Sequence, residues 1–146
     1  MIQDQLKVKG DLIVKLFDKN GQVKEQRFIP NLVVTVGKQF IASRMVGTAA
    51  NVMSHMAIGS SSTAPANGDT ALGGELGRVA LTSGTAAGVV ATYVATFPAG
   101  TGTGAVVEAG IFNASSSGTM LCRTTFSVVN KGVDDAMSIT WAITVS

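Results

Sequence analysis

Charged side chains are scarce in this chain. Asp, Glu, Lys and Arg make up 14% of its 146 residues, whereas soluble domains carry about 25%. No apolar run approaches the roughly 18–20 residues of a membrane-spanning helix, so we expect no membrane partner. A soluble chain with so little charge leaves apolar and Ser/Thr-rich surface, which favours burial against other subunits. A monomer with a Thr-rich sheet face is the alternative.

Cysteine and histidine each occur once. A single Cys122 excludes an internal disulfide and a Cys-based zinc site, and we interpret it as a small core residue. His55 cannot build a His-rich metal site, and no Gly-x-Ser-x-Gly elbow accompanies it. The glycines complete neither the dinucleotide fingerprint nor the Walker motif. We therefore expect no enzyme: no catalytic residues, no metal, no cofactor and no small-molecule substrate.

The basic residues are concentrated in the first third of the chain. Residues 1–44 hold eight basic and four acidic groups, a net +4, and the remainder holds three basic and five acidic groups, a net −2. A basic N-terminal hairpin at about 6–29 is expected to dock on an acidic partner. No aromatic residues interleave with its lysines, so we expect no direct nucleic-acid contact. A solvated hairpin face is the alternative. The candidate contact residues are Lys7, Lys9, Lys15 and Arg27.

Local patterns predict strands and one helix in the first part of the chain. Asn20-Gly21 between the runs 6–17 and 23–29 predicts a β-hairpin, because both turn residues tolerate positive φ. Pro30 and Asn31 are expected to end the second strand. Apolar residues at helical spacing predict a helix at 36–46, with Thr35 as its N-cap and Gly47 as its stop. The N-terminus lacks an apolar signal-peptide core, so no secretory signal is expected.

The stretch 54–81 has a different character. An apolar run ends at Gly59 and gives way to a loop of Ser, Thr, Ala, Pro, Asn and Gly. Asp69 is expected to cap a short helical turn near 70–76 that carries Leu72 and Leu76. We interpret residues 59–77 as an ordered loop and a candidate contact surface, with these two leucines among its contact residues.

The rest of the chain alternates apolar and polar residues. Runs at 88–97, 105–112, 120–129 and 139–145 are separated by Gly, Ser, Asn and Asp. In the last run, the apolar residues are expected to face a core and the threonines to face out: Ile139, Trp141, Ile143 and Val145. In the run 6–17, the apolar side chains likewise share one face, opposite the lysines: Val8, Leu12, Val14 and Leu16. Seven or eight short strands at this spacing predict a mainly β fold, an antiparallel β-sandwich or barrel-like, jelly-roll-like domain. A chain of this length fits one domain, so we expect a single β-rich domain at 1–146.

Five motifs follow one another through residues 31–146. They are 31–38 (NLVVTVGK), 55–59 (HMAIG), 69–78 (DTALGGELGR), 108–113 (EAGIFN) with 120–123 (MLCR), and 139–143 (ITWAI). In this order they resemble small virion structural proteins of tailed bacteriophages. The resemblance covers nearly the whole chain and brings no catalytic residues. It implies either a capsid decoration (cement) protein or a tail-fibre or baseplate module.

Two properties favour the capsid. The chain has no stalk, coiled coil or long repeat through which a fibre would project. Its basic first third suits a negatively charged capsid lattice. We therefore expect a cement protein, a dimer or trimer, that stabilises the shell of major capsid protein on the outer surface of the virion after synthesis in the bacterial cytoplasm. A tail-fibre, collar or baseplate adaptor that contacts host surface glycans is the alternative, and a small hydrolase built on His55 is a more distant one.

Overall fold

The computed structural model describes residues 5–47 and 51–146 of the protein. Within these residues the chain is mainly β, with 55% strand and 8% helix. The elements in chain order are β1 (Val8–Phe17), β2 (Val23–Val33), α1 (Thr35–Met45), β3 (His55–Gly59), β4 (Glu75–Ala80), β5 (Ser83–Ala87), β6 (Val90–Phe97), β7 (Gly104–Phe112), β8 (Met120–Lys131) and β9 (Ala136–Val145).

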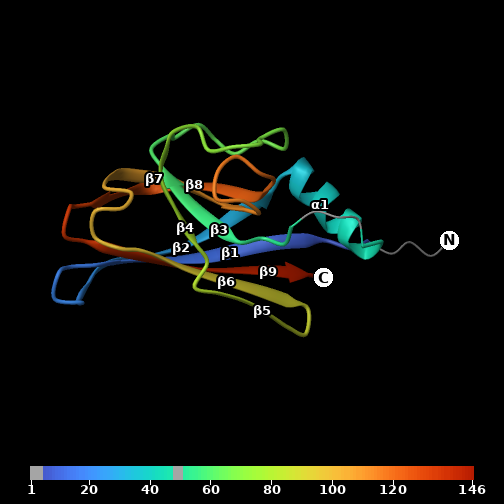
Figure 1. The fold of residues 1–146 in the computed structure, drawn as a ribbon, viewed down its shortest axis with the longest axis horizontal. Helices are drawn as coiled ribbons and strands as arrows, with labels where there is room; N and C mark the ends of the chain where they lie inside the picture. The colour runs from blue at the N-terminus through green and yellow to red at the C-terminus, as the bar shows by residue number, and fades with distance from the viewer. Residues whose placement is uncertain (1–4, 48–50) are drawn as a thin grey trace.

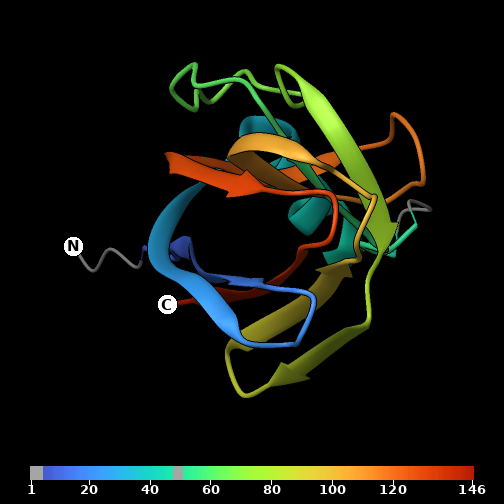
Figure 2. The same cartoon turned by 90° about the vertical axis from the view of Figure 1, so that its left-hand side faces the viewer.

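All nine of these strands belong to one antiparallel sheet in the order β4-β3-β7-β8-β2-β1-β9-β6-β5. The sheet curls into a half-barrel, which Figure 2 shows nearly end-on. β2 serves both halves of the sheet, since it pairs with β1 along most of its length and with β8 only at Leu32 and Val33. The predicted antiparallel, barrel-like β domain is confirmed. The strand β5 was not predicted, because its sequence SGTAA lacks apolar alternation.

The core lies inside the curl and follows the period-2 pattern of the strands. Leu12, Val14 and Leu16 of β1 are buried there, and Trp141 on the neighbouring β9 is fully buried. The predicted inward faces of these two strands are therefore confirmed. Their lysines and threonines take the opposite face, so one side of the sheet is exposed.

The predicted helix is confirmed, but its cap is not the predicted one. α1 begins at Thr35, Val34 takes the N-cap position, and no side chain caps the helix. Instead the Thr35 N–H donates to the carbonyl oxygen of Asn67 at 2.8 Å. A distant loop thus satisfies a backbone donor that a local side chain usually takes. Thr35 as N-cap was therefore wrong, because the tertiary contact replaced the local one.

Two further sequence predictions were wrong. Residues 70–74 form no helical turn, and Glu75 and Leu76 already belong to β4. Asp69 cannot act as a helix cap there because its carboxylate binds Arg123 and the Ala66 N–H. β2 also continues through Pro30 to Val33. A proline is tolerated within a strand where no neighbouring strand needs its missing N–H. On the β8 side of β2 this holds for Pro30, because β8 pairs with β2 only at Leu32 and Val33.

A buried lysine holds two loops together at the end of the barrel remote from α1. Lys131 Nζ donates to the carbonyl oxygens of Pro98 at 2.9 Å and Asp135 at 2.7 Å. Burial lowers the pKa of Lys131. The Asp135 carboxylate accepts hydrogen bonds from Lys24 Nζ at 2.9 Å and from the Gly132 N–H, and the Lys24 bond is the main cause of its lowered pKa. Lys24 of the basic hairpin is therefore engaged within the chain.

Gly37 gives a test of how α1 packs. A Cβ at this position would overlap the backbone carbonyl oxygen of Leu121 on β8. In an open helix, Gly→Ala stabilises by about 1 kcal/mol. Here the overlap should reverse the sign, so we expect Gly37→Ala to lower the free energy of unfolding by about 1–3 kcal/mol. Urea denaturation of wild type and variant measures this difference.

Gln39→Ala is the matched control, because Gln39 lies exposed on the same helix. It should change the free energy of unfolding by no more than about 0.5 kcal/mol. A Gly37→Ala protein as stable as wild type would show that α1 is not seated on β8 in this way.

Candidate functional site

The loop predicted at 59–77 is shorter in the structure, where residues 60–74 connect β3 to β4. We call residues 60–74 the clamped loop. It crosses the outer face of β7 and β8 and reaches the N-terminus of α1 (Figure 1). Loops of this length without secondary structure are uncommon and are usually either functional or disordered. This one is held from below by two buried side chains of the sheet.

Glu108 on β7 is the first of these side chains and is fully buried. Its Oε2 accepts hydrogen bonds from the N–H groups of Ser61 at 2.9 Å and Gly74 at 2.8 Å. Its Oε1 accepts the Gly73 N–H at 2.9 Å. One carboxylate therefore binds both ends of the clamped loop and satisfies three backbone donors that the sheet cannot reach.

Arg123 on β8 is the second and pairs with the first. Its Nε and Nη2 lie 3.1 and 3.0 Å from Glu108 Oε1. Nη1 donates to Asp69 Oδ2 at 3.0 Å, and Nη2 donates to the carbonyl oxygen of Thr63 at 2.9 Å. Glu108 therefore binds the ends of the loop, and the Arg123 guanidinium binds its middle. Burying such charges is costly unless they are paired and fully hydrogen-bonded, as they are here.

Glycines allow the loop to approach the carboxylate closely. A Cβ on Gly59 would lie 2.5 Å from Glu108 Oε2, and one on Gly74 would lie 2.7 Å from Ser60 Oγ. A Cβ on Gly73 would overlap Ser61. The Gly-Gly pair predicted as part of a helical turn is instead the place where the backbone passes over Glu108.

The two predicted contact leucines have different environments. Leu72 is buried in a small cluster with Val34, Ala57, Phe112 and Met120 beneath the loop. It anchors the loop and, at 9% exposure, leaves little surface for a partner. Its role as a contact residue stays a prediction. Leu76 is 38% exposed and lies beside Gly104. The exposed part of the loop consists of small and polar side chains.

Arg78 on β4 fixes the neighbouring loop between β7 and β8. Its guanidinium carbon lies 3.8 Å from the centroid of the Phe112 ring. Its Nη1 donates to the carbonyl oxygens of Ala114 at 3.0 Å and Ser117 at 2.9 Å. Arg78 Nη2 also forms an ion pair with Glu75 Oε1 at 2.7 Å, three residues earlier on the same strand.

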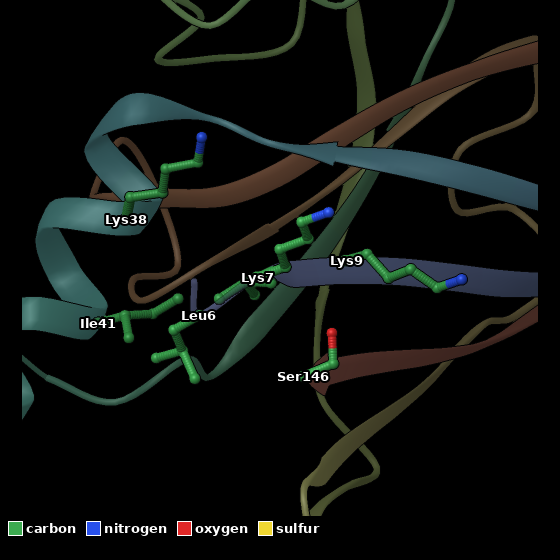
Figure 3. A pocket seen from close by; sticks show the side chains of 7 residues that line it. Leu6, Lys7, Lys9, Lys38, Ile41 and Ser146 are labelled. Atoms are coloured by element: carbon green, nitrogen blue, oxygen red, sulfur yellow. The ribbon is translucent and has the colours of Figure 1, made fainter. Parts of the chain in front are cut away.

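A hollow of about 540 Å³ opens between the start of β1, α1 and the end of β9, and we call it the basic hollow (Figure 3). Leu6, Val8 and Ile41 give it apolar walls. Its other lining residues are Lys7, Lys9, Lys38 and Ser146. Figure 3 shows Leu6 beside Ile41, with the three amino groups extending away from this apolar pair. The hollow therefore combines apolar walls with positive charge.

The predicted basic contact residues do not form one surface. Lys7 and Lys9 meet at the basic hollow, whereas Lys15 lies about 20 Å from Lys9 along β1. Arg27 pairs in register with the buried Val14, so it lies on the opposite face from Lys15, and it binds Glu25 at 3.3 Å. Lys38 was missed, because only tertiary packing brings the first turn of α1 to β1.

The remaining candidate chemical groups are accounted for by packing. His55 is half-buried and its Nδ1 lies 2.8 Å from Ser54 Oγ. Burial raises the pKa of the Cys122 thiol well above its usual value, which agrees with its predicted place in the core. Burial also raises the pKa of Tyr93. Within the described ranges, no group of three or more His, Cys, Asp or Glu residues could hold a metal ion.

Because Glu108 is buried and Glu75 is partly exposed, replacing each by Gln should lower the free energy of unfolding by very different amounts. Glu108→Gln removes the charge that faces Arg123 and places an amide NH₂ group among donors. Breaking a buried pair on one side costs about 3–5 kcal/mol, so the free energy of unfolding should fall by that amount. Urea denaturation with a constant m-value measures it.

Glu75→Gln is the matched control, because Glu75 is partly exposed and binds one arginine. It should cost about 1 kcal/mol or less. Similar small losses in both variants would contradict a clamp centred on Glu108.

Comparison with known proteins assigns this chain to no family. No protein-family model matches it, and neither a curated protein nor a solved structure matches it. In the part of the chain that the structure describes, α1 is the one helix, and it is too short to cross a membrane.

Proposed function

We propose that this chain is a non-enzymatic structural protein of a tailed-bacteriophage virion. In this proposal it is a decoration, or cement, protein that binds the outer surface of the assembled shell of major capsid protein. The resemblance of its motifs to small phage virion proteins supplies the class of particle. The basic hollow and the clamped loop support binding to another protein surface.

The observation that carries the proposal is the basic hollow. Lys7, Lys9 and Lys38 surround apolar walls, and none of the described residues that line the hollow has an acidic side chain. Such a site suits an acidic protein surface that presents an apolar side chain at its centre, since charge complementarity steers the encounter and apolar burial holds it. An assembled capsid repeats such a surface many times.

The clamped loop supports the same proposal. Because Glu108 and Arg123 already order the loop, it loses little conformational entropy on binding. A protein that binds the assembled shell and not the free subunits stabilises the shell by mass action. The rival function, a tail-fibre, collar or baseplate adaptor, would use the same rigid surface at a few positions per particle. For its glycan contacts, Trp141 offers no platform, because it is fully buried.

Charge reversal around the basic hollow tests the binding surface. Lys7→Glu, Lys9→Glu and Lys38→Glu together should weaken binding to shells stripped of this protein by roughly 10- to 100-fold at low salt, with a smaller loss at high salt. Co-sedimentation with shells from the phage that carries the gene measures the affinity, and circular dichroism checks the fold. Unchanged binding by the triple variant would exclude the hollow as the contact.

Lys19→Glu is the matched control. Lys19 lies exposed in the turn between β1 and β2, at the other end of β1 from the basic hollow. Each Lys→Glu change lowers the net charge by two, so Lys19→Glu is compared with Lys38→Glu alone. Lys19→Glu should leave binding within about twofold of wild type, whereas Lys38→Glu should weaken it more. An equal loss in these two single variants would mean that net charge, and not the hollow, decides binding.

Copy number separates the proposed function from its rival. Quantitative mass spectrometry of purified particles gives the ratio of this chain to the major capsid protein. Hundreds of copies per particle are expected of a cement protein, and a handful would identify a tail or collar component. Absence from purified particles would overturn the proposal as a whole.

A further inference from the structure

The strand β5 forms one edge of the sheet and has a free side. Among residues 5–47 and 51–146 it pairs only with β6, and all five of its residues are exposed. Gly88, at φ +58°, begins the two-residue connection between the strands, as in a type II′ hairpin turn. Such a turn makes Ala87 and Val90 a hydrogen-bonded pair, and the pattern alternates from there. Gly84 and Ala86 therefore direct their N–H and C=O groups away from β6, toward the free side.

This edge lacks the features that usually protect edge strands. Natural sheets block exposed edges with charged side chains, prolines or bulges. The sequence has no charged residue anywhere between Arg78 and Glu108, and β5 has no proline. The pairing of β5 with β6 shows no register shift. Within the described part of the chain, no backbone group bonds to the free side of Gly84 or Ala86, so their N–H and C=O groups can pair with another strand.

The edge continues onto an uncharged stripe of the exposed sheet face. The pairing registers place five residues, one from each strand, side by side on this face: Ser83, Val94, Thr140, Ile13 and Phe28. Phe28, at the far end of the stripe, is 72% exposed. Figure 1 shows β5 and β6 at the lower border of the sheet, away from the clamped loop. A partner strand at β5 would therefore extend the sheet without touching the loop.

We propose that β5 pairs antiparallel with β5 of a second copy of this chain about a two-fold axis at Thr85. Gly84 of each copy then faces Ala86 of the other, and each of these two pairs exchanges two N–H···O bonds, about four in all. Thr85 meets its own counterpart in a non-hydrogen-bonded pair, where threonine side chains interact favourably.

A second copy is the occupant that the surface favours. A charged partner strand would find no complementary charge along 79–107, whereas a copy of this edge brings no charge that could be repelled. Self-pairing needs no capsid, so the proposal stands or falls independently of the proposed function.

Ala86→Pro tests the pairing without damaging the hairpin. Proline removes an N–H that points to the free side, where no bond within the chain is lost. Sedimentation velocity at concentrations up to about 1 mM should show a dimer for wild type and a monomer for Ala86→Pro. Circular dichroism and a melting temperature within a few degrees of wild type check that the variant is folded.

Cross-linking tests the register. The two Thr85 residues would have Cα atoms about 4.5 Å apart, within the range of a disulfide. Thr85→Cys should form a covalent dimer under mild oxidation, and Ser62→Cys, at an exposed position of the clamped loop, should not. Native Cys122 does not compete because it is buried. A monomeric wild type, a dimeric Ala86→Pro protein, or equal cross-linking of both cysteine variants would each overturn the proposal.

Discussion

The ion pair between Glu108 and Arg123 is the constraint on which the outer surface of this half-barrel depends. Both side chains are buried, and together with Asp69 they bind the clamped loop at both ends and in its middle. The loop cannot leave the sheet without exposing a paired charge or stranding backbone donors, and either change is costly in a low-dielectric site. The loop in turn caps α1 through Asn67. One pair of charges thus orders a loop and the start of a helix.

The sequence predicted the parts of the fold that local periodicity determines. The hairpin turn at Asn20-Gly21, the inward faces of β1 and β9 and the helix followed from spacing and turn residues. The clamp could not be found in this way, because Glu108, Arg123 and Asp69 are far apart in the chain and pair only across the folded sheet. Asp69 was consequently assigned to a helix cap. Lys38 was not predicted as a contact residue for the same reason, because its position beside β1 depends on how α1 packs.

Three features of the surface are arranged so that each can be used separately. The basic hollow lies at the start of β1, the clamped loop covers β7 and β8, and β5 borders the sheet (Figure 1). The proposed cement function requires a surface for the shell and, with the proposed pairing of β5, a surface for a second copy, and the two proposed surfaces lie on different elements. The uncharged segment 79–107 contains β5, where the second copy would pair, and three lysines line the basic hollow.

Amide hydrogen exchange of the wild-type protein tests the clamp most directly. If Glu108 holds the loop, the amides of Ser61, Gly73 and Gly74 should exchange as slowly as those in the central strands, because they open only when the surrounding structure unfolds. The exposed neighbours Ser62 and Ala71 should exchange rapidly. Rapid exchange at all five amides would contradict the account, because the loop would then move independently of the buried carboxylate beneath it.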